Sequence, residues 1–273
     1  MPIYMDVHGS LGGASQDDIR EAHAADLATQ DEFGVRWLTW WFNAPQGKAF
    51  CLVEAPDADT AVACHKKAHG LAPHEIIEVS GDSMAGFFGD FSKDPHDQAV
   101  LPGKGNEPDT ALRAIMFTDI VGSTHLSTTL GDEAAMRVLE MHDTVVRACL
   151  DDLDGREVKH TGDGILASFV SISGAVDAAM AMQQKLAGMR EGGDAIEITI
   201  GISAGEPVNK NDDLFGASVN LAARLCAHAE ANQIVVSSAV NDHALGKPYH
   251  FAPVGSIALK GFDEPVHAYE VEI

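Results

Sequence analysis

The first eighty residues carry apolar and polar positions in a pattern that predicts four strands and two helices. Apolar positions two apart are typical of a strand with one buried face, whereas apolar positions three or four apart indicate a helix. Strands are predicted at 3–8, 34–42, 48–55 and 74–80, and helices at 15–33 and 57–70. The order βαββαβ predicts a ferredoxin-like sandwich, with two helices on one face of an antiparallel sheet.

The second predicted strand is apolar on both of its faces. Strict alternation places Val35, Trp37 and Trp41 on one face and Leu38, Trp40 and Phe42 on the other. Two helices on one side of the sheet leave the other face without cover, so we expect something else to bury it. A second protomer is the simplest candidate.

Residues 81–110 differ in composition from the segments on either side. They are rich in Gly, Pro and Asp and show no sustained apolar period, which predicts a linker with a short turn of helix near 87–91. A chain of 273 residues is long enough for two domains. We therefore predict domains at 1–80 and 111–273, joined by the linker 81–110.

The second half repeats the pattern on a larger scale. Helical periods appear at 135–150, 173–189 and 217–231, and we interpret His142, on the first of these, as an ordinary surface or packed residue. Strands are predicted at 112–120, 156–160, 165–169, 195–205, 233–238, 255–261 and 267–273. Helices against one mixed or antiparallel sheet indicate a second α+β domain.

Composition and charge exclude several classes of partner. No run approaches the roughly eighteen apolar residues of a membrane span, and the N-terminus lacks the features of a signal peptide. The four cysteines lie far apart, which is typical of reduced thiols in a cytoplasmic protein. A formal charge of −23 would repel nucleic acid and anionic lipid. We expect neither a nucleic-acid partner nor a membrane partner.

Two aspartates of the second half are predicted to meet at one end of its sheet. Asp119 ends the first strand, in "FTDIVGST", and Asp163 lies at the tip of the hairpin "KHTGDGILASF". Two carboxylates held together repel unless cations bridge them, and two hard metal ions about 3.5–4 Å apart would do so. The stretch "VGST" begins a helix, whose free N–H groups suit phosphate oxygens. Alone, each aspartate is explained as a helix cap or a turn residue; together they indicate phosphoryl or nucleotidyl transfer.

A later helix supplies the complementary charge. Asn220 and Arg224 are one turn apart and face the same way on a helix otherwise rich in Ala and Leu. The planar guanidinium of Arg can hold a phosphate through two hydrogen bonds. Lys260, near a strand end, is either a further cation of this site or a solvated surface lysine.

The motifs "FTDIVGST", "VKHTGDGILASF" and "DLFGASVNLAARL" occur in this order across residues 111–273. In order and spacing this half resembles the catalytic domain of class III nucleotidyl cyclases, whose fold is a ferredoxin-like core with additions. The resemblance implies conversion of ATP to 3′,5′-cyclic AMP and pyrophosphate. It also implies that Asp119 and Asp163 bind two Mg²⁺ or Mn²⁺ ions, with the Ile120 carbonyl as a further ligand.

The same resemblance assigns the remaining site residues. The backbone of Ser123 and Thr124 would hold the distal phosphates, and Lys159 with Asp213 is the pair that selects adenine. The other implied roles are ribose positioning by Asn220, transition-state stabilisation by Arg224 and pyrophosphate binding by Lys260. In this family the metal carboxylates come from one protomer and the purine-reading side chains from the other, so a homodimer is implied. Glu206 stands near a position where some relatives have Arg.

Two other functions compete with that of an adenylate cyclase. A template-directed polymerase would need a basic groove, which a chain of charge −23 does not obviously offer. A catalytically silent cyclase fold that binds nucleotide as a sensor stays open as the alternative.

Histidines of the first half are candidates for a second metal site. His65 and His69 have the i, i+4 spacing of a shared metal ion, and His8 and His23 are further candidates. The stretches "EAHAADLA", "FCLVEAPDA" and "AHGLAPHEIIEV" resemble small bacterial nickel-binding ferredoxin-like domains. The resemblance implies Ni²⁺ or another transition metal, since imidazole favours late first-row ions. The domain would then regulate the cyclase dimer, or it would only strengthen dimerisation.

Overall fold

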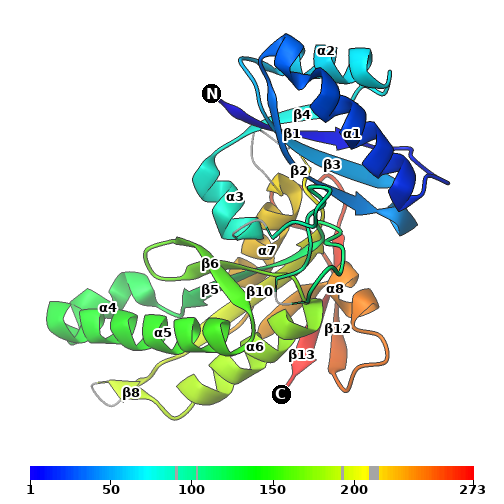
Figure 1. The fold of residues 1–273 in the computed structure, drawn as a ribbon. Helices are drawn as coiled ribbons and strands as arrows, with labels where there is room; N and C mark the ends of the chain where they lie inside the picture. The colour runs from blue at the N-terminus through cyan, green and yellow to red at the C-terminus, as the bar shows by residue number, and fades with distance from the viewer. Residues whose placement is uncertain (90–91, 103, 192–193, 209–214) are drawn as a thin grey trace. The chain divides into compact units, whose positions relative to one another are not determined.

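The computed structural model describes residues 1–273 except 90–91, 103, 192–193 and 209–214 (Figure 1). The chain divides into two compact units. The N-terminal unit comprises Met1–Leu112 and Pro207–Gly216, and the C-terminal unit comprises Arg113–Glu206 and Ala217–Ile273.

The N-terminal unit contains a four-stranded antiparallel sheet with the strand order β2-β3-β1-β4. Its strands are β1 (Ile3–His8), β2 (Arg36–Asn43), β3 (Lys48–Glu54) and β4 (Glu75–Val79). Helices α1 (Gln16–Phe33) and α2 (Ala58–Ala68) lie side by side on the sheet (Figure 1). The ferredoxin-like prediction is confirmed.

Local sequence signals explain where these helices begin and end. The Ser15 side chain accepts from the Asp18 backbone, and the Asp18 carboxylate accepts from the Ser15 N–H, which completes a capping box at the start of α1. Asp57 caps α2 in the same way by accepting from the N–H of Thr60. Both helices therefore begin where their first polar cap predicts.

The predicted faces of β2 were partly wrong. Trp37, Trp40 and Phe42 share one buried cluster with residues of α1 and α2, whereas the Trp41 ring lies 4.9 Å from that of Phe88. The pairing of β2 with β3 shifts between Trp37 and Thr39. This bulge inserts one residue, so alternation restarts and Trp37 joins Trp40 instead of Trp41.

The second face of this sheet is covered by the chain itself, which corrects the expectation of a covering protomer. Helix α3 (Gly81–Phe88), longer and earlier than the predicted turn at 87–91, buries Met84, Phe87 and Phe88. The Nε1–H of Trp41 also donates to Asp109 at 3.3 Å. Phe215, from the second stretch of the N-terminal unit, is fully buried with its ring 4.8 Å from that of Phe87.

The C-terminal unit is built on a seven-stranded mixed sheet, where the sequence left a mixed and an antiparallel sheet open. The strand predicted at 255–261 lies earlier, at His250–Ile257. The strand order is β12-β13-β11-β10-β5-β7-β6, with β10 and β11 parallel and the other pairs antiparallel. The strands are β5 (Arg113–Ile120), β6 (Gly155–His160), β7 (Ile165–Phe169), β10 (Ile198–Gly205), β11 (Ile234–Ser237), β12 (His250–Ile257) and β13 (Val266–Glu272).

Helices of this unit match the predicted segments, with small additions. They are α4 (Ser123–Leu130), α5 (Asp132–Asp152), α6 (Ile172–Leu186), α7 (Gly216–His228) and the short α8 (Ser238–His243), which the sequence did not indicate. Two short antiparallel strands of two residues each, β8 (Arg190–Glu191) and β9 (Asp194–Ala195), were also missed. Within the described ranges, none of the helices is both long enough and apolar enough to cross a membrane.

Candidate functional site

The Gly-Asp-Gly turn between β6 and β7 presses its backbone against the end of β5. A Cβ atom at Gly164 would lie 1.8 Å from the carbonyl oxygen of Thr118, so only glycine fits this close approach. Gly162 has φ +107°, which side-chain-bearing residues rarely adopt. The Ile120 N–H donates to the carbonyl oxygen of Asp163 at 3.2 Å, and this bond holds Asp163 beside the end of β5.

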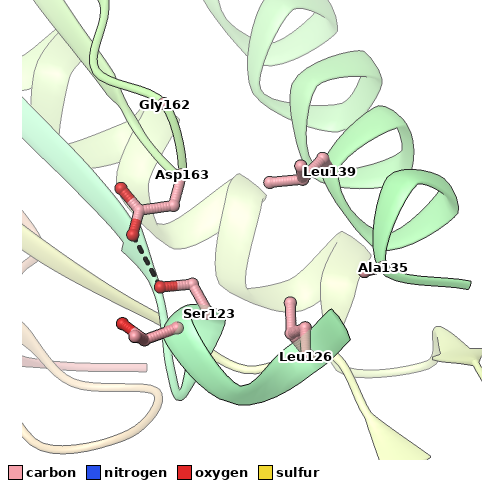
Figure 2. A pocket seen from close by; sticks show the side chains of 7 residues that line it. Ser123, Leu126, Ala135, Leu139, Gly162 and Asp163 are labelled. Atoms are coloured by element: carbon pink, nitrogen blue, oxygen red, sulfur yellow. Dashed lines mark hydrogen bonds between the residues drawn. The ribbon is translucent and has the colours of Figure 1, made fainter. Parts of the chain in front are cut away.

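Asp119 and Asp163 interact directly at this junction. Burial, the negative charge of Asp163 and a hydrogen bond to it raise the pKa of Asp119 to about 6. The Ser123 hydroxyl donates to Oδ2 of Asp163 at 2.6 Å (Figure 2). A pair of partly buried carboxylates that resist ionising together is the oxygen donor set that a hard divalent cation would stabilise. The residues present therefore fit Mg²⁺ or Mn²⁺.

A pocket opens beside Asp163 and the start of α4 (Figure 2). Its volume is about 300 Å³. Polar groups of Ser123, Thr124 and Asp163 form one side, and apolar side chains of α4 and α5 form the other; the lining residues are Ser123, Thr124, Leu126, Ala135, Leu139, Gly162 and Asp163. The first turn of α4 offers N–H groups at this pocket, which is the arrangement that favours an anion.

Four further predicted site residues, three of them cationic, lie elsewhere on the C-terminal unit. Asn220 and Arg224 are exposed and one turn apart on α7, as their spacing predicted. Lys159 on β6 and Lys260 after β12 are also exposed. In the described part of a single chain, none of these four residues lines the pocket beside Asp163. Asp213 lies outside the described residues.

A second cluster of possible ligands is buried in the N-terminal unit, between the sheet and its helices. Asp6 and His8 of β1, Cys51 of β3 and His65 of α2 bring their ligand atoms within 4.8 Å of one another. Asp26, His65 and His69 form an adjoining group by the same measure. Nitrogen, oxygen and thiol donors together fit a late first-row divalent ion such as Ni²⁺.

Hydrogen bonds within this cluster centre on His65. Its Nε2 lies 2.6 Å from Asp6 and its Nδ1 lies 2.9 Å from Asp26. Burial would lower the pKa of His65, but the two carboxylates outweigh it and raise this pKa to about 10. Burial and the Asp6 charge raise the pKa of the Cys51 thiol well above its usual value. At neutral pH a proton on His65 therefore balances the carboxylates, and a metal ion would replace it.

Sequence reasoning found only part of this cluster. His8, His65 and His69 are brought together, whereas His23 belongs to neither group of ligand atoms, and its Nε2 lies 3.8 Å from Asp97. Asp6, Asp26 and Cys51 were missed. Two of them had a signal: Asp6 is two residues from His8, on the same face of β1, and Cys51 lies directly opposite Asp6 in the antiparallel register.

The mixed sheet with its ferredoxin-like core, and the carboxylate pair beside a helix N-terminus, place the C-terminal unit in the class of nucleotidyl cyclase folds. Residues 108–272 match the model of the adenylate and guanylate cyclase catalytic domain, and the chain belongs to this family. Residues 4–79 match the model of the nickel responsive protein SCO4226-like family. Both resemblances found in the sequence are thereby confirmed.

Individual relatives agree with this assignment. A Rhizobium meliloti protein that carries the provisional name adenylate cyclase 3 is 32% identical over 164 residues, which cover 58% of this chain and 28% of that protein. An adenylate cyclase of Podospora anserina is 32% identical over 155 residues, which cover 47% of this chain and 7% of that protein. The chain thus spans only a minor part of these relatives.

Solved structures match the same region. The adenylyl cyclase CyaB from P. aeruginosa is 25% identical with a TM-score of 0.51, covering 59% of this chain and 94% of that one. The guanylate cyclase domain of RhGC from Catenaria anguillulae, in complex with GTP, has a TM-score of 0.53 at 21% identity, covering 59% of this chain and 96% of that one. The latter likeness concerns the fold alone.

Proposed function

We propose that this chain is an adenylate cyclase that converts ATP to 3′,5′-cyclic AMP and pyrophosphate as a homodimer, with residues 111–273 as catalytic domain. The observation that carries the proposal is the contact of Asp119 with Asp163 beside the first turn of α4, where burial and mutual repulsion raise the pKa of Asp119 to about 6. Such a pair favours bound cations, and the pocket next to it has room for phosphates.

Different residues of the chain would then bind the metal ions and the phosphates. Asp119, Asp163 and the Ile120 carbonyl would hold two Mg²⁺ or Mn²⁺ ions, and the Ser123 hydroxyl keeps Asp163 oriented. When bound, such ions lower the pKa of the ribose 3′-hydroxyl and neutralise charge on the phosphates. The N–H groups of Ser123 and Thr124 would bind the distal phosphates. Positioning and electrostatics account for the rate without a covalent intermediate.

Adenine is the base that we propose for the substrate. Lys159 and Asp213 match the adenine-selecting pair of the family, and relatives from Podospora anserina and Mycosarcoma maydis carry the name adenylate cyclase. The solved domain bound to GTP has the same fold, so the fold does not select the base. GTP is therefore the substrate to test beside ATP.

A site shared between two protomers accounts for the position of the other residues. The pocket beside Asp163 is lined, among the described residues of one chain, by none of Lys159, Asn220 and Arg224. We propose that a partner copy brings Asn220, to place the ribose, and Arg224, to stabilise the transition state. Lys260 would bind the leaving pyrophosphate.

The direct test is product formation by the purified full chain. We expect cyclic AMP from ATP with Mn²⁺, less or no cyclic GMP from GTP, and no product from Asp119→Asn or Asp163→Asn. A chain that binds ATP in the presence of Mn²⁺ but forms no product would instead be the nucleotide sensor.

Mixing Asp119→Asn with Arg224→Ala, each inactive alone, should restore activity because a mixed dimer retains one intact site. No recovery despite demonstrated exchange of protomers would refute the shared site.

For the N-terminal unit, we propose a transition-metal site that regulates this cyclase. The buried set of Asp6, His8, Cys51 and His65 supports it, since these donors converge from two strands and a helix. Phe215 offers a connection to the catalytic residues. It packs on Phe87 and Phe88 of α3, and the chain enters α7, which carries Asn220 and Arg224, at the next residue.

Metal regulation is tested on the full chain at protein concentrations where it is dimeric. We expect Ni²⁺ or Zn²⁺ to change the rate under saturating Mn²⁺-ATP, and His65→Gln to remove this response. The exposed His250→Gln serves as matched control and should respond like the natural chain. If the rate ignores Ni²⁺ and Zn²⁺ while calorimetry shows that they bind, the unit is a dimerisation aid and not a sensor.

A further inference from the structure

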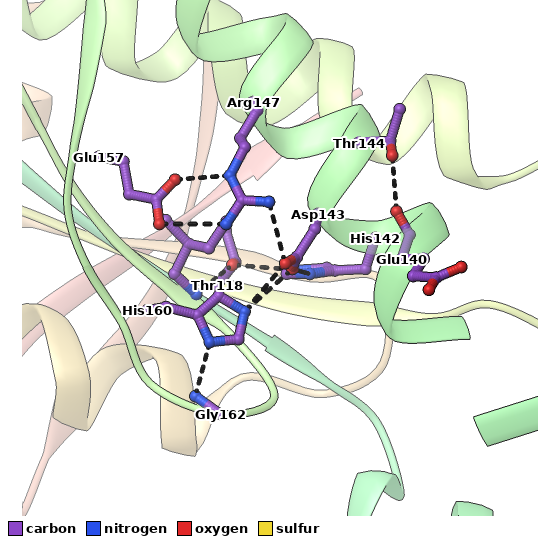
Figure 3. A network of polar contacts seen from close by, with 10 residues as sticks. Thr118, Glu140, His142, Asp143, Thr144, Arg147, Glu157, His160 and Gly162 are labelled. Atoms are coloured by element: carbon purple, nitrogen blue, oxygen red, sulfur yellow. Dashed lines mark hydrogen bonds and ion pairs between the residues drawn. The ribbon is translucent and has the colours of Figure 1, made fainter. Parts of the chain in front are cut away.

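A polar network on the C-terminal unit joins helix α5 to the Gly-Asp-Gly turn (Figure 3). At its centre is Asp143 of α5, which accepts from three side chains. His142 Nδ1 lies 3.1 Å from it, His160 Nε2 lies 3.0 Å from it, and Arg147 Nη1 lies 3.1 Å from it. Arg147 is in turn paired with Glu157 of β6 at 2.7 Å. Asp143 is therefore held in one place by its own partners.

The carboxylate of Asp143 determines which ring nitrogen of His160 carries a proton. Because an ionised carboxylate only accepts, Nε2 of His160 must be the donor. In the neutral ring, Nδ1 is then an acceptor, and it lies 3.2 Å from the backbone N of Gly162. The N–H that precedes Asp163 thus donates to a ring whose tautomer Asp143 sets.

His142 connects Asp143 to the other end of the turn, at Ile165, through Thr118. Its Nδ1 must donate to Asp143, so its Nε2 accepts from the Thr118 hydroxyl, 3.1 Å away. The oxygen of Thr118 accepts from the Ile165 N–H at 3.1 Å. His142 is fully buried, and burial lowers its pKa against the opposing effect of Asp143, so the neutral ring that this arrangement requires is favoured.

We propose that Asp143, through the tautomers of His142 and His160, is the positioning residue for the metal carboxylate Asp163. Two backbone N–H groups, that of Gly162 just before Asp163 and that of Ile165 two residues after it, are connected to this one carboxylate. Neither histidine touches Asp163, so their part is to fix the turn that carries it. Residues that orient metal ligands in this way typically affect metal affinity or activity 10- to 100-fold.

Two substitutions of His160 separate positioning from general stability. In Asn, Oδ1 sits one bond beyond Cγ, as Nδ1 does in His, so His160→Asn keeps an acceptor for the Gly162 N–H. In Gln, the amide nitrogen reaches the place of Nε2, so His160→Gln keeps the bond to Asp143 and loses that acceptor. We expect cyclase activity close to the natural level for His160→Asn. For His160→Gln we expect a loss of about 10- to 100-fold in kcat, with a higher Mn²⁺ concentration for half-saturation.

Asp143→Asn should cause a similar loss, because one of the two acceptor oxygens becomes an NH2 donor. In the place of Oδ1 this nitrogen would face His142 Nδ1, and in the place of Oδ2 it would face His160 Nε2 and Arg147 Nη1, all of which are donors to Asp143. Glu140→Gln is the matched control: it makes the same chemical change one turn away on α5, at an exposed position (Figure 3), and should leave the rate unchanged. Melting temperatures would show whether each variant stays folded. Equal activity in His160→Asn and His160→Gln, or an unaffected Asp143→Asn, would overturn the proposal.

The activity readout rests on the proposed cyclase function, so a second readout is independent of it. Ring nitrogen NMR shifts of the full chain should show His160 protonated at Nε2 and His142 at Nδ1. Asp143→Asn should change the tautomer of at least one of them. A natural chain that makes no cyclic AMP would refute the proposed function alone. Opposite tautomers in the natural chain, or tautomers unchanged by Asp143→Asn, would refute the positioning network.

Discussion

Replacing Asp119 by Asn should make the metal-free fold more stable while it removes the response to metal. In the fold, burial and Asp163 raise the pKa of Asp119 from its usual 3.8 to about 6. At 1.36 kcal/mol per pKa unit, ionising the Asp119 carboxyl costs at most about 3 kcal/mol more in the folded chain than in the unfolded chain. Asp119 is only partly buried, so solvent screening reduces the expected cost to about 1 kcal/mol.

The sign of the pH dependence follows from the raised pKa. Between pH 4 and 6 the folded state binds a proton that the unfolded state has released, so the free energy of unfolding falls as pH rises through this window. Above pH 7 the penalty is complete. Asn has no such proton, so the variant should gain about 1 kcal/mol over the natural chain between pH 4 and pH 8.

Urea unfolding in the presence of a chelator measures this difference. All three tryptophans lie in 37–41 of the N-terminal unit, so their fluorescence reports the unfolding of that unit. Far-UV circular dichroism also detects the unfolding of the C-terminal unit, which contains Asp119. Adding Mn²⁺ at 100 times its dissociation constant should raise the free energy of unfolding of the natural chain by about 2.7 kcal/mol. The same addition should change that of Asp119→Asn little. Asp151→Asn, at an exposed position on α5, is the control. A stability difference that stays constant from pH 4 to pH 8 would refute the repulsion between Asp119 and Asp163.

Other consequences of the structure are also measurable. Arg224→Ala should lower kcat about 100- to 1000-fold, as expected for one transition-state donor, and a loss below tenfold would argue against that role. Lys159→Glu with Asp213→Cys should sharply reduce ATP use, and a full preference for ATP in steady-state kinetics would place base selection elsewhere. His65→Ala leaves Asp6 and Asp26 buried without their shared cation and should cost about 3–5 kcal/mol in urea unfolding. Since the folded pKa of His65 is about 10, its stabilisation is complete below pH 6.5 and is lost as pH rises toward 10, so a natural chain equally stable at pH 7 and 10 would contradict this account.

The sequence by itself determined most of the elements and identified the two carboxylates that meet at the Gly-Asp-Gly turn. Capping residues such as Ser15 and Asp57 act within one helical turn, so their effect is local and readable along the chain. Asp119 and Asp163 were found because one closes a predicted strand and the other lies at the tip of a predicted hairpin, and the order of strands indicates which ends meet. Gly162 and Gly164 mark the turn that the backbone requires.

Only the tertiary structure decided what those elements bring together. The bulge after Trp37 changed the face of one tryptophan because register depends on the partner strand, and α3 covered a face that we had left to a second protomer. Asp26 and Cys51 joined Asp6 and the histidines through contacts between strands and helices that sequence spacing does not encode. His142 looked like an ordinary surface or packed residue, yet its ring joins its neighbour Asp143 to Thr118, which is 24 positions from His142. The physical reason is that side-chain chemistry is local, whereas burial, register and hydrogen-bond partners arise only when distant segments pack.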